Sequence, residues 1–373
     1  MKIQSFTNIQ DVNKSIWEQN LNELEYFHNT TFLEIVQNSA IQNCKLEFLT
    51  ISEENEIIAT AVVGVFTMEL NMFIKPNFFT KTIKKISPNF FNINLIFCGT
   101  PVSIGHSNLY INLNFKDKTQ EIINLIQTKI DELSKRHKVN FFSFKEFREK
   151  EATELESSLI NNDYFKAHSL PTIDLIFDEE NYFESLSKNK RRQINNSLKK
   201  IGFTFQNINF NTLNQNGFLF SIKAAKDFSP DLFHANYLKI LGRSKTKFET
   251  LNLEFFNFFF KKENGTILSL EKDNAIIASF LFLEQANSIT FVWVSRENKK
   301  DDFDSYFNLM SAMIKWAVQK QKKVIYLGQT TYYTKMRMGG KPEGLYLFFK
   351  AKNKLLNKIL KIANRFIFPE IKL

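Results

Sequence analysis

The densest group of reactive side chains lies in residues 326–340, which read YLGQTTYYTKMRMGG and follow an apolar run typical of a buried strand. A single lysine, Lys335, stands in the middle of this segment. An ammonium group just beyond a strand can bind a phosphate or stabilise a developing oxyanion. The alternative is a solvated surface lysine, which most lysines are. We favour a functional Lys335 because of its position.

The side chains around Lys335 could complete a polar site. The strand ends at Gly328, and Gln329, Thr330 and Thr331 follow with groups that could donate hydrogen bonds to the same ligand. The rings of Tyr332 and Tyr333 could stack on a ligand, hydrogen-bond to it or simply pack. The glycines at 339–340 permit a close backbone turn.

A basic segment, Lys188–Lys200, is the second candidate. Its apolar residues fall near one helical stripe, namely Leu186, Ile194, Leu198 and Ile201. Arg191 lies at the edge of that stripe and could point into a groove between domains. Arginine suits bidentate phosphate capture, so we assign Arg191, Arg192 and Lys188 to the binding of anionic groups of a donor or substrate. The alternative is a solvated basic helix face.

Reactions that release a proton from a nucleophile require a proton acceptor near it, or a chain of water molecules. The candidates are Tyr306, Tyr333, Asp227 and His234, of which the two tyrosines are our choice beside Lys335. His234 stands among apolar neighbours on an expected helix, where a structural role is more common. No Ser-His-Asp or Cys-His group is evident, which favours direct attack by the acceptor over a covalent enzyme intermediate.

Alternating helices and strands must position these residues. The first half predicts helices at 20–38, 119–137 and 147–161, and strands at 45–51, 56–67, 92–99, 139–144 and 171–177. The order of a hairpin, a strand, a helix and a strand then recurs. The second half predicts helices at 183–201, 211–227, 231–242, 249–262 and 303–321, and strands at 202–208, 265–273, 274–285, 287–295 and 323–328.

This repeated order predicts an α/β (mixed α+β) protein with two domains, at 1–175 and 176–373. The phenylalanine-rich run at 254–262 is typical of a buried helix face. Two cysteines and five scattered histidines among 373 residues show no ligand spacing, so we expect no metal. The N-terminus lacks the apolar region of a signal peptide and no window is long enough to span a membrane, so we expect a cytoplasmic protein.

A formal net charge of +10 could attract tRNA, anionic lipid or a phosphorylated substrate, although a general bias towards lysine explains much of it. The C-terminal residues 345–373 alternate apolar residues with lysines at helical spacing. We expect a closing helix that packs its apolar face on the second domain and turns its lysines outward. The alternative is a helix that lies on an anionic membrane surface.

The second half resembles the acetyltransferase domains of the GNAT superfamily. A basic segment, FESLSKNKRRQINNSLKKIGF, precedes the hairpin IIASFLFLEQANSITFVWV, a helix and then YLGQTTYYTKMRMGG. More narrowly, it is similar to the FemAB-like branch, whose members often carry two GNAT-like domains in tandem. FCGTPVSIGHSNLY in the first half stands where that branch often has a glycine–proline loop. Lys335 matches the lysine that FemAB-like proteins place after the glycine of their last core strand.

The resemblance implies two tandem GNAT-like acyl-CoA N-acyltransferase domains, each a mixed central sheet flanked by helices. It implies an acyltransferase that moves an acyl or acetyl group from acyl-CoA, as a co-substrate, to an amine on a small molecule or a cell-wall precursor. The alternatives are aminoacyl transfer from a charged tRNA and a non-catalytic binding protein on the same fold.

The expected helix start near Phe303 departs from the GNAT pattern. The acyl donor of such folds lies between two parallel strands that splay apart, here expected at 287–295 and 323–328, and its diphosphate meets a glycine-containing loop at the following helix. The segment 295–307 has no glycine, and Asp301, Asp302 and Asp304 crowd the helix start. Acids stabilise that end of a helix but repel a diphosphate, and we interpret Asp302 as a helix cap.

Overall fold

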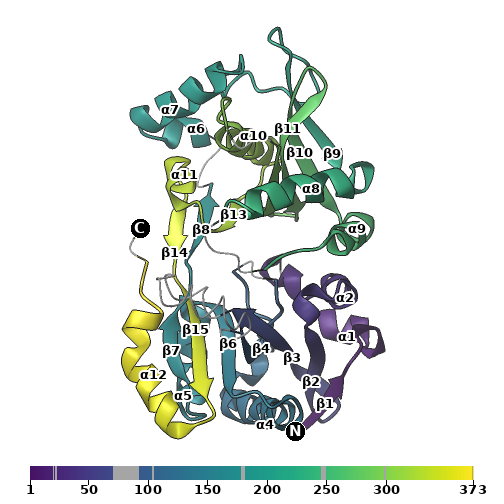
Figure 1. Ribbon diagram of the computed structural model, residues 1–373, viewed down its shortest axis with the longest axis vertical. Helices are drawn as coiled ribbons and strands as arrows, with labels where there is room; N and C mark the ends of the chain where they lie inside the picture. The colour runs from purple at the N-terminus through teal and green to yellow at the C-terminus, as the bar shows by residue number, and fades with distance from the viewer. Residues whose placement is uncertain are drawn as a thin grey trace, which may run out of the picture. The chain divides into compact units, whose positions relative to one another are not determined.

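The computed structural model describes residues 1–19, 21, 23–69, 92–102, 105–177, 181–244, 249–297, 300–371 and 373. The chain divides into two compact units. Unit 1 comprises Met1–Leu170, Thr246–Thr250 and Gly344–Lys372, and unit 2 comprises Pro171–Lys245 and Leu251–Glu343 with Leu373. Each unit is a mixed sheet with helices packed on it, which confirms the predicted mixed α/β class (Figure 1).

The sheet of unit 1 has the strand order β1-β2-β3-β4-β6-β15-β7, with β5 pairing β3. Its elements are β1 Lys2–Phe6, α1 Lys14–Glu18, α2 Thr30–Asn38, β2 Lys45–Glu53, β3 Glu56–Glu69, β4 Asn92–Cys98, β5 Leu109–Ile111, α4 Thr119–His137, β6 Phe141–Arg148, α5 Glu149–Ile160, β7 Phe165–His168, β15 Leu345–Ala351 and α12 Lys354–Ile367. The apolar stripe of α4, with Ile122, Ile126 and Ile130, is fully buried in the core of this unit.

The sheet of unit 2 has the order β14-β8-β13-β12-β11-β10-β9. Its elements are β8 Thr172–Ile176, α6 Tyr182–Ser185, α7 Lys188–Lys199, β9 Phe218–Ala224, α8 Pro230–Leu241, α9 Leu253–Lys262, β10 Gly265–Lys272, β11 Ala275–Glu284, β12 Ser288–Arg296, α10 Ser305–Gln319, β13 Val324–Gln329, α11 Tyr332–Arg337 and β14 Lys341–Glu343. In both units, a parallel strand pair joined by a helix lies inside an otherwise antiparallel sheet.

Several predictions from the sequence are confirmed. The long helix at 119–137 is α4 with the same bounds, and the phenylalanine-rich run forms α9, whose Phe255 and Phe259 are buried against Trp293. The hairpin β10–β11 turns at Asp273 and Asn274, both with positive φ, as a two-residue turn that matches strand twist requires.

Residues 202–208 do not form the predicted strand. Phe203, Phe205 and Ile208 are buried in the core of unit 2, as the apolar pattern indicated. Their backbone, however, bonds to asparagine side chains: the N–H of Thr204 donates to Asn207 and that of Phe205 to Asn195. A segment whose donors are satisfied locally in this way needs no strand neighbour.

The helix predicted at 211–227 is also wrong, because β9 runs through it. Gly217 has a φ of +77°, and the Asn214 side chain accepts from the N–H groups of Asn216 and Phe218, which ends any helix there. Beyond this turn, β9 pairs antiparallel with β10 along Lys272–Thr266. Sheet pairing overrides the local helix propensity of this segment.

The predicted first helix and the basic helix are each interrupted. Residues 23–28 form a 3₁₀-helix before α2, whose start is capped by Asn29. The basic segment breaks at Leu186–Ser187 into α6 and α7, because the Ser187 side chain accepts the N–H of Lys190 and starts a new helix.

The C-terminal segment corrects the predicted assignment of residues 344–372 to the second domain. The strand β15 pairs antiparallel with both β6 and β7, so it fills a place in the sheet of unit 1 (Figure 1). Conversely, β8 directly follows the first segment of unit 1 in the sequence, but it pairs with β13 in the sheet of unit 2. Long-range strand pairing of this kind carries no local sequence signal.

Candidate functional site

The predicted site residues of 326–340 lie where two parallel strands part. The strands β12 and β13 pair only through Ser288–Thr290 and Val324–Tyr326. Beyond these residues, β12 continues to Arg296 along β11, and β13 continues to Gln329 along β8. We call this place the β12–β13 divergence.

Two irregularities in the sheet coincide with the divergence. The register of β12 against β11 shifts between Phe291 and Trp293, and that of β13 against β8 shifts between Tyr326 and Gly328. A β-bulge bends its strand and increases the local twist. The two bulges therefore account for the end of pairing between β12 and β13.

The chain then turns sharply. Gly328, Thr330 and Thr331 have φ values of +69°, +62° and +51°. A β-branched threonine in the left-handed region is strained, at a cost of about 1–3 kcal/mol for each residue. This turn starts the short helix α11, which carries Lys335 back towards the end of β13.

Lys335 is buried rather than solvated, with 1% of its surface exposed. Its Nζ donates hydrogen bonds to the carbonyl oxygens of Gly328, at 3.1 Å, and Gln329, at 2.6 Å. It also lies 5.9 Å from the ring centroid of Phe291, on β12. Within the described part of the chain, no carboxylate forms an ion pair with it.

Burial without a counter-charge lowers the pKa of Lys335 from 10.5 to about 7. Near neutral pH the amine therefore exists in both protonation states. With two donors used by Gly328 and Gln329, the ammonium keeps one N–H for a ligand, whereas the neutral amine keeps its lone pair. Such a group can bind an oxyanion in one state and accept a proton in the other.

Tyr306, from the first turn of α10, borders the divergence. Its ring packs against Phe280 and Phe291, with centroids 5.1 Å and 6.4 Å away. Burial raises the pKa of Tyr306, although a hydrogen bond from the Thr331 side chain opposes the shift. Tyr306 is therefore a neutral phenol at physiological pH, fit to donate a hydrogen bond rather than to act as a base.

The adjacent tyrosines lie in different surroundings. Tyr332 is half-buried, and burial raises the pKa of its hydroxyl. Tyr333 is 71% exposed, with the guanidinium of Arg337 5.2 Å from its ring centroid. Among the residues predicted in this segment, the structure brings together Lys335, Gly328 and Gln329, and it joins Tyr306 to the same turn through Thr331. It does not bring Tyr333 to them.

A hollow of about 420 Å³ lies beside the divergence, between α7, the start of α10 and α11; its lining includes Gln193, Lys200, Asp304, Tyr306 and Arg337. We call it the α7–α10 hollow. Arg337 donates from Nε to Gln193 at 2.8 Å, and its guanidinium lies 4.8 Å from the centroid of Phe307. Sequence reasoning missed Arg337, although it follows Lys335 by two residues in the same motif.

The predicted anion-binding residues of the basic segment are distributed differently. Arg191 forms an ion pair with Glu184 of α6, so its guanidinium already has an anion. Arg192 and Lys188 are exposed on α7. Lys200, which directly follows α7, lines the hollow and pairs with Asp304 at 2.7 Å.

The acids at the start of α10 are already engaged. Asp301, rather than Asp302, caps the helix by accepting the N–H of Ser305 at 2.6 Å, and it pairs with Arg296 at 2.7 Å. Asp302 is exposed and pairs with Lys300. The Asp302 carboxylate thus faces Lys300, and it is Asp301, one residue earlier, that receives the N–H of Ser305, the first residue of the helix. This helix end is occupied by protein carboxylates.

The remaining base candidates do not join the polar groups of this site in the described chain. Asp227 is exposed in the short 3₁₀-helix Ala225–Asp227, and His234 packs against the rings of Tyr237 and Phe256. Among the residues that the structure describes, no group of three His, Cys, Asp or Glu side chains could hold a metal ion.

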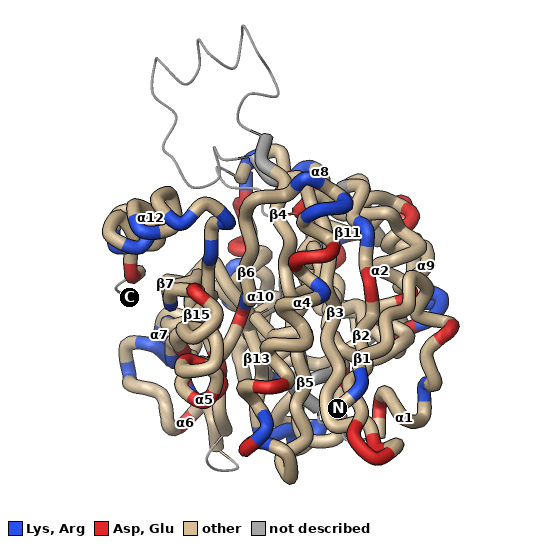
Figure 2. The backbone as a smooth tube through the Cα atoms, turned by 90° about the horizontal axis from the view of Figure 1, so that it is seen from below, with Lys and Arg blue, Asp and Glu red and all other residues tan. Residues whose placement is uncertain are grey.

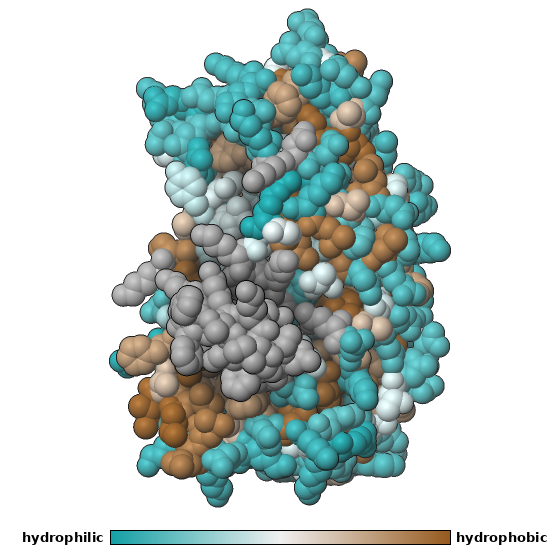
Figure 3. Space-filling model, viewed as in Figure 1, coloured by the Kyte–Doolittle hydropathy of each residue, from teal (hydrophilic) through white to brown (hydrophobic). Residues whose placement is uncertain are grey.

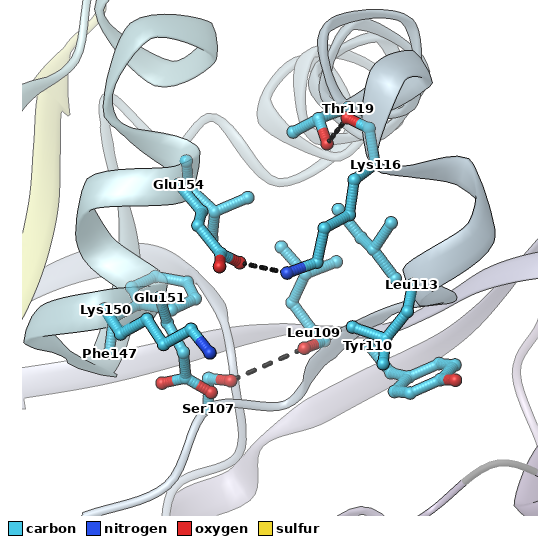
Figure 4. A pocket seen from close by; sticks show the side chains of 12 residues that line it. Ser107, Leu109, Tyr110, Leu113, Lys116, Thr119, Phe147, Lys150, Glu151 and Glu154 are labelled. Carbon is cyan, nitrogen blue, oxygen red and sulfur yellow. Dashed lines mark hydrogen bonds and ion pairs between the residues drawn. The ribbon is translucent and has the colours of Figure 1, made fainter.

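Unit 1 has a hollow of its own, of about 490 Å³, that sequence reasoning did not predict. It lies between the 3₁₀-helix Leu113–Lys118 and α5 (Figure 4). Lys116 and Glu154 pair across it at 2.8 Å, and Glu151 accepts the backbone N–H of Arg148 at 2.9 Å. Lys116, Glu154 and Glu151 are thus engaged with one another or with a helix start, and we do not assign the chemistry to this hollow.

Comparison with solved structures shows that the chain has a GNAT-like fold of the FemAB type. The structure is similar to that of FemX, with a TM-score of 0.59 and 10% identity over 97% of this chain and 100% of that one. It is also similar to the C-terminal domain of a lysylphosphatidylglycerol synthetase candidate from Agrobacterium fabrum, with a TM-score of 0.52 and 10% identity over 98% of each chain.

A further similar structure is a conserved protein of unknown function from Bacteroides thetaiotaomicron, with a TM-score of 0.51 and 11% identity over 91% of this chain and 98% of that one. No family model and no curated protein matches the sequence. At these identities the likeness shows the fold, and the residues of this chain must carry any argument about its reaction.

Proposed function

We propose that unit 2 is an N-acyltransferase that moves an acyl group from an activated donor to an amine. The observation that carries this proposal is Lys335, buried without a counter-charge at the end of β13, where the pairing of β12 and β13 stops. In this proposal the acyl carbonyl of the donor lies in the divergence, beside Lys335 and the Tyr306 hydroxyl.

In the reaction, the nitrogen of the acceptor attacks the acyl carbon and a C–N bond forms. The carbonyl oxygen becomes an oxyanion, which the third N–H of the Lys335 ammonium and the hydroxyl of Tyr306 can stabilise. The bond from carbon to the leaving group, a thiolate or an alkoxide, then breaks. The proton that the amine loses passes to the leaving group, for which Lys335 is suited by a pKa of about 7.

The α7–α10 hollow is the proposed place of the acceptor. It shares Tyr306 with the divergence, and its lining includes Asp301 and Asp304, whose carboxylates pair with Arg296 and Lys200. Arg337 and Lys200 add cations to the same lining, which suits an acceptor that also carries a carboxylate or a phosphate. Amino acids, phosphorylated amino sugars and peptide precursors of cell walls have this mixture of charges.

For the donor we propose an acyl-CoA thioester, as the resemblance implies. One observation favours a second candidate, an aminoacyl ester of tRNA. The carboxylates of Asp301 and Asp304 occupy the start of α10, where a diphosphate would otherwise meet free N–H groups. A donor that places no diphosphate there avoids this repulsion, and the net charge of +10 suits an RNA.

The test is an activity screen with both donors. The protein is incubated with a panel of amines and either acetyl-CoA or longer acyl-CoAs, or with tRNA charged with radioactive amino acids, and transfer of label to the amine is measured. Transfer from either donor supports the proposal and identifies the donor class. Absence of transfer from both, together with absence of thermal stabilisation by either, would overturn it in favour of the non-catalytic binding protein.

A further inference from the structure

The C-terminal helix α12 turns its apolar face away from the protein. Its 14 residues, KLLNKILKIANRFI, are docked on unit 1 by polar side chains. The Asn357 side chain accepts the N–H of Ala351 and donates to the carbonyl of Asp163, and Asn364 donates to that of Lys166. No residue of α12 is fully buried, so the predicted packing of its apolar face on a domain core is wrong.

The outward face carries a continuous apolar stripe. Leu355, Ile359, Ile362 and Phe366 are 70%, 52%, 74% and 88% exposed. Their spacing of four, three and four residues places them on one side of the helix. Figure 3 shows the corresponding hydrophobic surface over α12, at the lower left. Singly exposed apolar residues are common, but a contiguous stripe marks an interaction surface.

A basic stripe runs beside the apolar one. Lys354, Lys358, Lys361 and Arg365 each precede one residue of the apolar stripe, so they repeat the same spacing one position earlier. The helix contains no acidic residue, as its blue segments in Figure 2 indicate. An apolar stripe flanked by lysine and arginine is the pattern of helices that lie in the plane of a membrane interface.

We propose that α12 binds the surface of an anionic lipid bilayer, with Leu355, Ile359, Ile362 and Phe366 inserted among the acyl chains near the headgroups. The basic stripe would then contact lipid phosphates. The helix lies on the membrane rather than across it, because 14 residues span roughly 21 Å, less than the hydrocarbon core. Within the described residues, no helix is long and apolar enough to cross a membrane.

This inference is independent of the proposed function. It depends only on the residues of α12 and on their exposure, and it adds a location to whatever reaction unit 2 performs. A protein held on a bilayer by α12 would meet acceptors or products that are themselves attached to lipid.

The experiment is co-sedimentation of the full chain with vesicles of phosphatidylcholine alone or with one third phosphatidylglycerol, at low and moderate salt. We expect binding to the anionic vesicles, weakening with salt, and at least tenfold weaker binding to the neutral ones. The double variant Ile362→Glu/Phe366→Glu should lower the partition coefficient at least tenfold. The double variant Lys358→Glu/Lys361→Glu should also bind less and lose its salt dependence.

Two matched controls separate this surface from general charge and hydrophobicity. Lys226→Glu/Lys261→Glu alters two exposed lysines elsewhere, and Leu113→Glu/Leu213→Glu alters two exposed leucines elsewhere. Both controls should bind as the unaltered chain does. Equal losses in the controls, or no binding by the unaltered chain, would overturn the proposal.

A second measurement locates the helix in the bilayer. A Phe366→Trp variant adds a tryptophan on α12 to those already in the chain. Brominated phosphatidylcholine in the anionic vesicles should quench the fluorescence of this variant more than that of the unaltered chain. Absence of this extra quenching, or a dimer in sedimentation velocity that Ile362→Glu/Phe366→Glu dissociates, would assign the stripe to a protein contact instead and overturn the membrane proposal.

Discussion

Both units contain a parallel strand pair joined by a helix, but the two pairs end differently. In unit 1, β4 and β6 pair from Leu95–Phe141 to Cys98–Phe144, and Cys98 is the last residue of β4. In unit 2, β12 and β13 stop pairing at Thr290 and Tyr326, while both strands continue. The same order of elements thus gives a closed sheet in one unit and a divergence in the other.

The residues that follow the strands explain the difference. In unit 1, the buried Asn108 accepts the N–H of Thr100 and donates to the carbonyl of Phe27, which holds the chain after β4 against the rest of the unit. Lys145 covers Gly99, because a Cβ at that glycine would lie 2.9 Å from the lysine side chain. In unit 2 the second strand of the pair, β13, is instead followed by the strained turn and the buried Lys335.

The fold thus provides a parallel strand pair in each unit, and the residues near the strand ends determine whether the two strands diverge. In unit 1, the side-chain amide of Asn108 satisfies backbone groups of the chain that follows β4. In unit 2, two β-bulges end the pairing of β12 and β13, and the buried amine of Lys335 lies at the divergence. This difference supports the proposal that the reaction takes place in unit 2.

Replacement of the buried lysine gives the sharpest test. We expect Lys335→Met to lower kcat about 100-fold or more in the reaction of the proposed transferase, since this is the usual cost of one lost oxyanion contact. The matched control is Lys145→Met, at the corresponding strand end of unit 1, which should retain activity. Steady-state kinetics of both folded variants provides the measurement, and equal activity in Lys335→Met would remove the lysine from the mechanism.

Replacement of Asn108, which holds the chain after β4 in unit 1, should lower the stability of the protein. Asn108→Ala leaves the N–H of Thr100 and the carbonyl of Phe27 without their partner in a buried place. We expect the free energy of unfolding to fall by about 2–3 kcal/mol. Urea denaturation measures the loss, and a change within experimental error would mean that Asn108 does not hold the loop.

Stability should depend on pH through Lys335. Its pKa in the folded protein, about 7, lies below the unfolded value of 10.5, so the unfolded chain binds more protons between these limits. The free energy of unfolding should therefore rise by about 1 kcal/mol per pH unit between pH 7 and pH 9. Lys335→Met should remove this part of the slope, and parallel curves for the two proteins would contradict the buried amine.

The smallest effect concerns the start of α10. Asp301→Ala removes the cap on Ser305 and the ion pair with Arg296, and we expect a loss of about 1 kcal/mol in the free energy of unfolding. Asp302→Ala removes only an exposed pair with Lys300 and should change the free energy little. Thermal denaturation of both variants decides between the two capping assignments, and a larger loss for Asp302→Ala would reverse ours.

Several elements of the fold can be predicted from the amino-acid sequence alone. Hydrophobic periodicity located α4, the hairpin β10–β11 and the strands on both sides of α10, because each of these elements satisfies its own spacing rule. The cluster of polar residues after β13, with Lys335 at its centre, can also be recognised in the sequence. A buried strand followed by hydroxyls, an amide and a lysine is an uncommon pattern.

Other features depend on contacts between segments that are distant in the sequence. The burial of Lys335 depends on Phe291 of β12, and the closure of unit 1 depends on Phe27 meeting Asn108 from 81 residues away. The pairing of β15 with β6 and the outward face of α12 likewise arise from contacts between distant segments. A helix shows its apolar stripe in the sequence, but whether that stripe faces a core or the solvent is fixed by what packs against its other side.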